Sequence, residues 1–438
     1  MIEPKFEAAV GMSRKWDAHE AGREVAETAI QKLSRPPDFF LLFSTIHYEK
    51  HGGFQEFLDG VWDVLPKGTP LVGGTVAGFM NNYGVYVHGA TALAVSYPNM
   101  DVAIGYGKNT KRNPKRAAHQ SVEMIKNKLA GSQYKNKFLF NFVSGPELMR
   151  IPGQGYKKVI NSGFMSRFIM LAFNTSQTIF QKGLGREDEI FEEITRILPN
   201  YSMLLGTSWD DYRGIHNYQF FNNNIFANSV LNLGISTDLD LDVCTNHGMK
   251  ETGIKLKVTK LSRDKHIIHK INGQPARKEL LHLLDWPQDF LSEKTMTRTI
   301  LYYPISYKRS GREVPIVTPG FIRDSILVPC KIDGGNVSIL TVSGKKLIDA
   351  AKDNLDFFNN IQPDFGLFSA CITVLGTLGF KTDFIRKEML KYFEEKPFIL
   401  FWSAGEGTYS PKESITYANM SFNTAIFGHK NHSKDDFL

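Results

Sequence analysis

Short apolar runs and amphipathic segments alternate along the 438-residue chain in one order that occurs three times. Each time the pattern indicates a strand, a helix, a strand, a second helix and then two strands in succession. The three units span about 5–98, 101–236 and 337–428. Because helices separate most of the apolar strands, we expect an α/β (α+β) fold of mixed sheets that are covered by helices.

A β-rich connecting segment separates the second unit from the third. Its runs alternate apolar and polar residues, which is typical of strands with one face in solvent. We therefore expect two regions, 1–250 with the first two units, and 251–438 with the β-rich segment to about 336 and the third unit. The second unit also has an insertion at about 145–185, and a loop that long is more often functional than passive.

Composition narrows the class of protein. The chain is 42% hydrophobic and 22% charged, as is usual for a soluble globular protein. No apolar run approaches the roughly 20 residues that cross a bilayer, and the first residues lack the apolar core of a signal peptide. The three cysteines are far apart and odd in number, which argues against disulfides and suits a reducing compartment. We expect a cytoplasmic protein that does not bind membranes.

The net charge of +7 raises the question of nucleic acid binding. The densest basic run, Lys108 to Arg116, precedes a predicted helix, and we interpret it as a solvated loop. Nucleic-acid-binding patches usually add aromatic side chains for base stacking or a known recognition motif, and neither accompanies this run. We expect no nucleic acid partner.

The third strand of each unit ends on small residues, at its joint with the next strand. Glycine permits a sharp turn and a close approach of two backbones, and we expect Gly73, Gly206 and Gly405 to be equivalent. Turning the chain can be their whole role. However, polar side chains gather at each joint, and strand ends in helix-covered sheets commonly bind ligands. These residues are Thr75 in the first unit, Thr207, Ser208 and Asp210 in the second, and Ser403 and Glu406 in the third.

At these joints the chain resembles the FIST family, whose members are sensory, ligand-binding modules of signal-transduction proteins. The resemblance covers most of the chain. The N-terminal half is similar to FIST N in PLVGGTVAG (70–78), MLLGTSWDD (203–211), NHGMKETG (246–253) and HKINGQPARKEL (269–280). The C-terminal half is similar to FIST C in FIRDSI (321–326), GLFSACITVL (366–375), FWSAGEG (401–407) and YANMSFNTAIFG (417–428).

The resemblance implies a non-enzymatic sensor that binds amino acids or similar small polar metabolites and signals to a downstream protein. Two departures bear on the ligand. Family members often carry an arginine soon after the cysteine of the FSC element, but none follows Cys371 here. The glycine pair of the second joint is reduced to Gly206–Thr207. The chain shows neither an F-box nor an attached kinase or cyclase domain, so the resemblance implies a stand-alone sensor.

Three further polar residues join the predicted ligand-binding set. His247, before a glycine in a predicted loop, can bind a ligand carboxylate, exchange protons near neutral pH or serve only in a turn. The Arg323 guanidinium suits a carboxylate, either of a ligand or of Asp324 or Glu406. Asn419 either satisfies backbone groups or contacts the ligand. The full predicted set is Thr75, Thr207, Ser208, Asp210, His247, Arg323, Glu406 and Asn419.

Glu406 follows a strand of apolar residues, so we expect its carboxylate at the rim of a strand end and beside a partner. A lone desolvated carboxylate costs several kcal/mol, and the predicted partner is a ligand cation, Arg323 or His247. We also expect one pocket between the halves, walled by Glu406 and by Thr207 to Asp210. An alternative is an enzyme in which His247 and Glu406 carry out acid–base chemistry on a small metabolite.

We predict no cofactor and no metal site. His47 and His51 are four residues apart and could bind one metal ion if helical, but no third ligand lies near them in the sequence. Some FIST proteins resemble haem sensors, so an axial histidine is a further alternative, although no haem motif is present. Cys371 follows an apolar strand without a base beside it, so we expect a buried thiol rather than a nucleophile. The chain lacks a phosphate-binding GxxxxGK[ST], a GxGxxG after a strand, GxSxG and HExxH.

Overall fold

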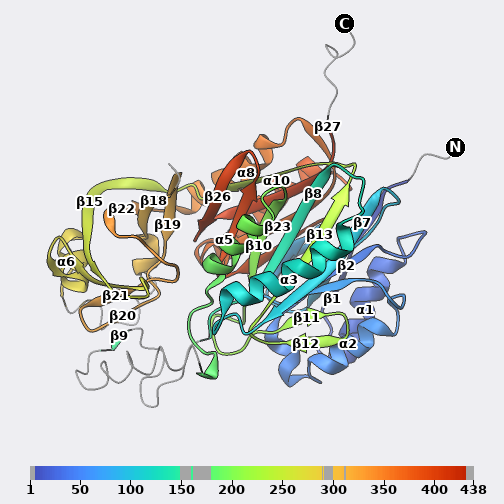
Figure 1. Ribbon diagram of the computed structural model, residues 1–438, viewed down its shortest axis with the longest axis horizontal. Helices are drawn as coiled ribbons and strands as arrows, with labels where there is room; N and C mark the ends of the chain where they lie inside the picture. The colour runs from blue at the N-terminus through green and yellow to red at the C-terminus, as the bar shows by residue number, and fades with distance from the viewer. Residues whose placement is uncertain are drawn as a thin grey trace, which may run out of the picture.

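The computed structural model describes residues 5–147, 159–160, 179–288, 290, 299–309 and 312–430. Within these ranges the strands form four sheets, three of six strands and one of nine. The three six-stranded sheets lie together, and the nine-stranded sheet lies to one side of them (Figure 1). The predicted α/β class is confirmed, because helices cover mixed sheets of parallel and antiparallel strands. None of the helices in the described part of the chain is both long and apolar enough to cross a bilayer.

The first sheet contains four strands of the first unit and is covered by two helices, α1 (Ala18–Ile30) and α2 (Phe54–Trp62). Its middle strands β2 and β3 are parallel, and β6 runs antiparallel between β1 and β2. Its order is β1 (Glu7–Ser13), β6 (Ala90–Ser96), β2 (Phe39–Ser44), β3 (Leu71–Thr75), β11 (Gln219–Phe221) and β12 (Asn224–Phe226).

The second sheet has the same arrangement with the strands of the second unit, and its helices are α3 (Pro114–Leu129) and α5 (Glu187–Ile197). Here β8 and β10 are the parallel pair. The order is β7 (Met100–Lys108), β13 (Ser229–Thr237), β8 (Asn136–Ser144), β10 (Ser202–Ser208), β25 (Glu406–Ser410) and β26 (Glu413–Ala418).

The third sheet follows the same order again, with β23 and β24 as the parallel pair. Its helices are α8 (Gly344–Phe357), α9 (Ile372–Leu378) and α10 (Thr382–Phe393), with the 3-10 helix η5 (Gly379–Lys381) between the last two. The strands are β14 (Asp240–Asn246), β27 (Phe422–Lys430), β23 (Ile361–Cys371), β24 (Phe398–Ser403), β4 (Phe79–Asn81) and β5 (Gly84–Tyr86).

Capping residues explain where several of these helices begin. The Asp17 carboxylate accepts a hydrogen bond from the Glu20 N–H (2.9 Å) at the start of α1. The Asn113 side chain accepts one from the Arg116 N–H (3.3 Å) at the start of α3, where Pro114 needs no hydrogen-bond acceptor for its nitrogen. Side-chain acceptors at this position satisfy N–H groups that have no partner within the helix.

A hairpin from another unit completes each six-stranded sheet. The hairpin β11–β12 of the second unit pairs with β3 of the first sheet, where Phe220 lies opposite Gly73. The hairpin β25–β26 of the third unit pairs with β10 of the second sheet, and β4–β5 of the first unit pairs with β24 of the third. Each unit therefore gives a hairpin to one neighbour and receives one from the other.

The sequence interpretation was wrong about two parts of this arrangement. It missed the hairpins, because strands of three residues such as β4 and β5 are too short for an alternating pattern, and it joined β5 and β6 into one strand. It also placed the first strand of the third unit near 337–342. That strand is β22 (Gly335–Thr341) of the nine-stranded sheet, and β14 takes the expected place in the third sheet.

The nine-stranded fourth sheet corresponds to the predicted β-rich segment. It lies between β14 and α8 along the chain, and it also includes β9 (Val159–Ile160) from the insertion. Most of the predicted insertion, 148–158 and 161–178, lies outside the described residues. The remaining strands are β15 (Lys250–Leu261), β16 (Ile267–Ile271), β17 (Gln274–Pro275), β18 (Ile305–Arg309), β19 (Arg312–Ile316), β20 (Gly320–Ile322) and β21 (Ser325–Leu327), with α6 (Ala276–Leu283) and the 3-10 helix η4 (Ile300–Tyr302).

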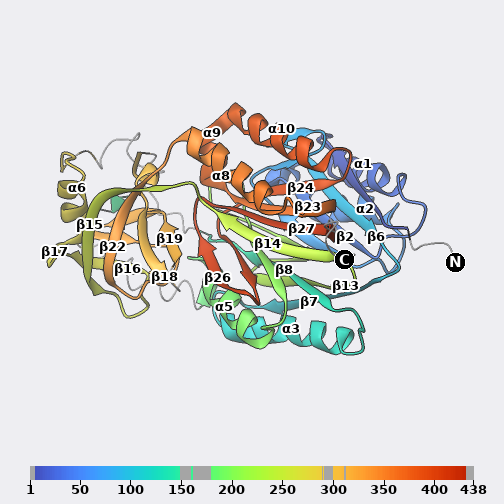
Figure 2. The ribbon, with the colours of Figure 1, turned by 90° about the horizontal axis from the view of Figure 1, so that it is seen from above.

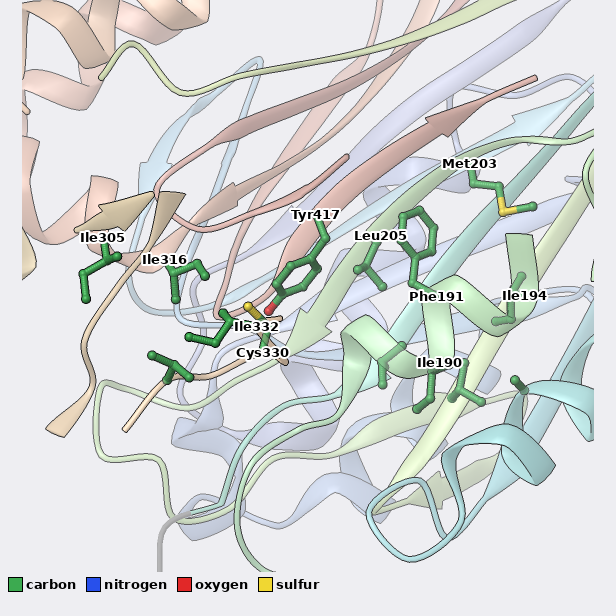
Figure 3. Close-up of a cluster of buried hydrophobic side chains, with 14 of the residues drawn as sticks. Ile190, Phe191, Ile194, Met203, Leu205, Ile305, Ile316, Cys330, Ile332 and Tyr417 are labelled. Atoms are coloured by element: carbon green, nitrogen blue, oxygen red, sulfur yellow. The ribbon is translucent and has the colours of Figure 1, made fainter. Parts of the chain in front are cut away.

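Apolar side chains join the fourth sheet to the second. The ring of Tyr417, from β26, lies between Ile316 of the fourth sheet and Leu205 of β10 (Figure 3). All three side chains are buried in one cluster that also contains residues of α5 and of β15, β16 and β22. The boundaries of the two predicted regions, 1–250 and 251–438, stay predictions.

Aromatic side chains fill the space between the inner faces of the three six-stranded sheets. Phe43 of β2 stacks on Phe401 of β24 with ring centroids 4.5 Å apart, and Phe142 of β8 lies edge-on to both rings at 5.5 and 5.8 Å. Seen from above, α3 and α5 lie on one side of the strands and α8 and α10 on the opposite side (Figure 2). The sheets thus share one core and keep their helices outside.

The alignment of the strand ends shows that the predicted equivalence of Gly73, Gly206 and Gly405 is wrong for Gly405. Thr75, Ser208 and Ser403 occupy the last positions of β3, β10 and β24, opposite the last residues of their parallel partners. Two residues earlier stand Gly73, Gly206 and Phe401. Gly405 lies beyond the end of β24, so Phe401 and not Gly405 is the counterpart of the two glycines.

We predict that Gly22→Ala destabilises the protein, because α1 and α2 cross at glycines. A Cβ atom on Gly22 would lie 1.9 Å from the Phe57 carbonyl oxygen. The helices must therefore separate, and we expect a loss of about 1–3 kcal/mol in the free energy of unfolding, measured by urea titration. Gly131→Ala is the control, since nothing lies within 4 Å of its added Cβ. Equal stability of the two variants would contradict the close helix crossing.

Candidate functional site

The ends of β3, β10 and β24 meet and are linked to one another by hydrogen bonds. The contacts are Trp209 N–H to Thr75 O (2.8 Å), Ala77 N–H to Trp402 O (3.2 Å), and Ala404 N–H and Gly405 N–H to Thr207 Oγ1 (both 3.0 Å). Each joint therefore contacts both of the others. The sequence prediction that polar groups gather at this place in the fold agrees with the geometry.

The hydroxyl groups of the predicted set are buried and are used within the joints. Thr207 Oγ1 accepts the two hydrogen bonds from the third unit. Thr75 Oγ1 accepts one from the Tyr218 N–H (2.9 Å), and Ser208 Oγ donates one to Asn217 Oδ1 (2.6 Å). These contacts hold the joints together, and ligand contact by the three hydroxyls stays a prediction.

Asp210 shapes the loop that connects β10 to β11. Its carboxylate accepts hydrogen bonds from the N–H groups of Arg213 (3.0 Å), Gly214 (2.7 Å) and Ile215 (2.7 Å). Burial raises the pKa of Asp210, while the backbone N–H groups act in the opposite direction by stabilising the charged form. The folded loop presents the side chains of Asp211 and Arg213 next to the first unit.

A cavity of about 560 Å³ lies between this loop and the loop that follows β2. It is therefore outside the carboxyl ends of parallel strands of two sheets, where α/β proteins commonly bind ligands. Asp210 is the member of the predicted set that lines it. The lining residues are Ile46, His47, Glu49, Lys50, His51, Lys182, Asp210, Asp211, Arg213, Ile215 and His216.

Side chains of both charge signs line the cavity, and several of them form ion pairs or hydrogen bonds with one another. The Arg213 guanidinium forms an ion pair with the Asp211 carboxylate, with Nε 2.8 Å from Oδ1. The Glu49 carboxylate accepts a hydrogen bond from the Tyr218 hydroxyl (2.6 Å) and lies 2.9 Å from His216 Nδ1. The cavity walls therefore carry both carboxylates and cationic side chains.

We predicted that Glu406 lies at the rim of a strand end. The structure shows instead that it is fully buried. Its neighbours are the Ser403 hydroxyl (3.3 Å from Oε2), the Cys371 thiol and the Ser421 N–H. Burial raises the pKa of Glu406 well above its usual value, because a low-polarity environment disfavours the charged form. Among the described residues no cation forms an ion pair with it, and the predicted pairing with Arg323 or His247 is wrong. Burial favours the neutral form of the acid, which needs no counter-charge.

A second buried acid, Glu187 at the start of α5, explains why residue 405 is glycine. The Glu187 Oε1 atom accepts a hydrogen bond from the Tyr417 hydroxyl (2.9 Å). A Cβ on Gly405 would lie 2.4 Å from the same oxygen. Burial raises the pKa of Glu187 to about 7, and the nearby Asp188 adds to this effect. Sequence analysis missed Glu187, since acids in a first helical turn are usually exposed.

Lys111 corrects the interpretation of the basic run as a solvated loop. Its side chain is fully buried, and its ammonium group donates a hydrogen bond to Asn228 Oδ1 (2.8 Å) and lies 4.0 Å from a Glu147 carboxylate oxygen. Burial lowers the pKa of Lys111 to about 8, although Glu147 acts in the opposite direction. Nothing in the sequence distinguishes this lysine from its exposed neighbours.

The remaining predicted residues lie away from the cavity lining. His247 Nδ1 accepts a hydrogen bond from the Met249 N–H (3.1 Å) in the loop after β14. Arg323 lies in the turn between β20 and β21 with a φ of 54°, and its neighbour Asp324 pairs with Arg277 (3.2 Å). Asn419 Oδ1 accepts a hydrogen bond from the Val317 N–H (3.2 Å), which agrees with the backbone role considered for it.

His47 and His51 belong to the 3-10 helix η1 (Ile46–Lys50) and the residue after it, rather than to an α-helix. Within the described ranges, no group of three or more His, Cys, Asp or Glu side chains is placed to hold a metal ion. The Cys371 thiol is buried, and burial together with Glu406 raises its pKa far above the usual value. The thiolate that a nucleophile requires is therefore suppressed.

Comparison with known proteins places the chain in a family. The family model of the FIST N domain matches residues 38–274, more than half of the chain. The chain therefore belongs to the FIST family, which is associated with sensory roles in signal transduction. The resemblance of its C-terminal half to FIST C stays a prediction. No protein with a curated description matches the chain.

Two solved structures show weak likenesses. A cyanuric acid hydrolase from A. caulinodans is 8% identical, with a TM-score of 0.28 over 54% of this chain and 72% of its own. PurLQS from Thermotoga maritima is 10% identical, with a TM-score of 0.20 over 97% of this chain and 73% of its own. These scores are too low to carry an argument about fold or function.

The buried Glu187 predicts a specific dependence of stability on pH. Its pKa is about 7 in the folded protein and ordinarily 4.5, so between these values the unfolded chain releases the proton and the folded chain keeps it. The free energy of unfolding therefore falls as pH rises through this window, by about 3 kcal/mol from this group. Glu187→Gln keeps the shape of the neutral acid and removes this loss.

The test is urea unfolding of the wild type and Glu187→Gln at about pH 5 and about pH 8. We expect the variant to gain stability relative to the wild type at the higher pH, because effects of all other groups cancel in the difference. If the difference in stability between the variant and the wild type is the same at both pH values, burial does not raise the pKa of Glu187. The control is Glu388→Gln on α10, where Glu388 pairs with Lys391. Its stability relative to the wild type should change little between the two pH values.

Proposed function

We propose that this FIST protein is a non-enzymatic sensor that binds a small ligand with charges of both signs, such as an amino acid, in the cavity beside η1. The observation that carries the proposal is the cavity at the ends of β2 and β10, with Asp211, Arg213 and Glu49 on its walls. The sensory role of the family supports it.

The charged walls suit a zwitterion better than an ion of one sign. A ligand carboxylate finds Arg213 and the ammonium groups of Lys50 and Lys182, while a ligand amino group finds Asp211 and Glu49. Charge-assisted hydrogen bonds of this kind are about twice as strong as neutral ones and also fix the orientation of the ligand. A volume of about 560 Å³ is in the range of small-molecule sites.

The burial of the acids supports binding rather than catalysis. An acid–base mechanism with Glu406 needs contact between its carboxyl group and a substrate, but this group is enclosed by Ser403, Cys371 and Ser421. We place the protein in the cytoplasm, where the thiols of Cys244, Cys330 and Cys371 stay reduced. Ligand binding between two loops of different units offers a way to change the surface seen by a downstream protein.

A thermal-shift screen with the common amino acids tests the proposal. We expect at least one to raise the melting temperature without being consumed, because a ligand that binds only the folded state stabilises it. Asp211→Asn and Arg213→Gln each remove one charge from the cavity wall and should weaken binding by about 1.5–3 kcal/mol, or roughly 10- to 150-fold in Kd.

The matched control is Asp383→Asn, which removes an equivalent surface ion pair on α10, far along the chain from the cavity lining. It should leave ligand binding unchanged. The proposal fails if no compound raises the melting temperature, or if the cavity variants and the control respond alike.

A further inference from the structure

One tryptophan and three histidines form a cluster beside the cavity, which we call the indole–imidazole shelf (Trp16, His47, His51 and His88). The indole of Trp16 stacks on the His88 ring with centroids 3.8 Å apart and an interplanar angle of 30°. It meets the rings of His51 and His47 edge-on at 4.9 and 5.8 Å. Nevertheless, 53% of the Trp16 surface is exposed.

Hydrogen bonds hold the loops that carry the shelf. The Thr45 N–H donates to the Gly89 carbonyl (2.9 Å), and the Gly89 N–H donates back to Thr45 Oγ1 (3.1 Å), which places His47 beside His88. The Ala18 N–H donates to the His51 carbonyl (2.9 Å), which fixes the loop of Trp16 against η1. These hydrogen bonds within the protein hold the shelf in place, and sites held in this way lose less entropy on binding.

The shelf continues the wall of the cavity. His47 and His51 line the cavity, and their rings also contact the indole of Trp16. Trp16 itself lies outside the cavity lining and is joined to it through these two imidazoles. Such an arrangement of a flat apolar surface and a few polar groups is usual in ligand sites.

The imidazoles supply polar atoms of a suitable kind. Burial lowers the pKa of both His47 and His88, so these rings are neutral at pH 7 and each has one donor and one acceptor nitrogen. Of the four ring nitrogens, His47 Nδ1 lies 3.1 Å from Thr45 Oγ1. The His88 Nε2 atom is buried, and no described residue forms a hydrogen bond with it.

We propose that the indole–imidazole shelf binds a planar heteroaromatic ring of the ligand. The inference rests on the proposed function, because it takes the charged part of the same ligand to occupy the cavity. The ring stacks on the exposed face of Trp16, and a ring nitrogen or exocyclic group at its edge exchanges hydrogen bonds with the imidazoles. Heteroaromatic amino acids and small ring carboxylates have both features.

Isothermal titration calorimetry on the full chain tests the inference with L-histidine, urocanate and nicotinate as ring compounds, and with L-alanine and L-glutamate as ring-free compounds. We expect a ring compound to bind more tightly than the ring-free ones. Loss of an aromatic side chain on which a ligand ring stacks weakens binding by about 5- to 150-fold. We expect Trp16→Leu to weaken the binding of a ring compound by the same factor.

Two further variants make the result specific. Trp16→Phe keeps a ring and should retain most of the affinity, whereas Phe384→Leu is the control, since its side chain is 52% exposed and lies on α10. The inference is overturned if a ring compound binds equally well to the wild type and to Trp16→Leu. The proposed function still stands in that case if Asp211→Asn weakens binding. Binding that depends on Trp16 but not on Asp211 overturns the proposed cavity and supports the shelf. No heat with any of the three ring compounds overturns the inference, while the proposed function is decided by the thermal-shift screen.

Discussion

The pairing of β11 with β3 is the interaction on which the rest of the structure depends. It takes a hairpin of the second unit into the first sheet, so the chain from the end of β10 must cross from one sheet to the other. That crossing loop carries Asp210, Asp211 and Arg213, and the crossing sets it against His47 and His51 of the first unit. The equivalent pairings of β4 with β24 and of β25 with β10 close the arrangement. The cavity is therefore a consequence of hairpin exchange, since no single unit contains both of its walls.

The same exchange explains the unusual number of buried polar groups at the joints. Three strand ends that meet bring backbone N–H and carbonyl groups together away from water, and side chains such as Thr207 and Asp210 satisfy them. Where buried carboxyl groups form no ion pair, as at Glu187 and Glu406, burial raises their pKa and so favours the neutral acid. Protonation lowers the cost of burial but makes the stability of the joints depend on pH.

The sequence predicted two helices in each unit, the longer strands and the family, because each produces a periodic pattern or a motif within one segment. It failed where the deciding partner lies far along the chain. β4 is three residues long and is a strand only because β24 lies beside it. Glu187 looks like an ordinary helix-start acid until Gly405 and Tyr417 cover it. Trp16, His47 and His88 come from three loops, and neither their contact nor the exposed indole face has a sequence signal. Of the predicted site residues, Asp210 lines the cavity because it lies in the crossing loop itself.

Native-state hydrogen exchange at the two sides of the β3–β11 pairing tests this account most directly. The Thr75 N–H donates to the Tyr218 carbonyl (2.9 Å) and the Asn222 N–H donates to the Leu71 carbonyl (2.9 Å), so both amides report on the contact between units. If hairpin exchange holds the protein together, these amides exchange only when β2 and β3 also open, with the same free energy of opening. The account is contradicted if the two amides exchange through a local opening whose free energy is several kcal/mol lower than that of β2 and β3. The hairpin would then open independently of the sheet and would not hold the cavity in place.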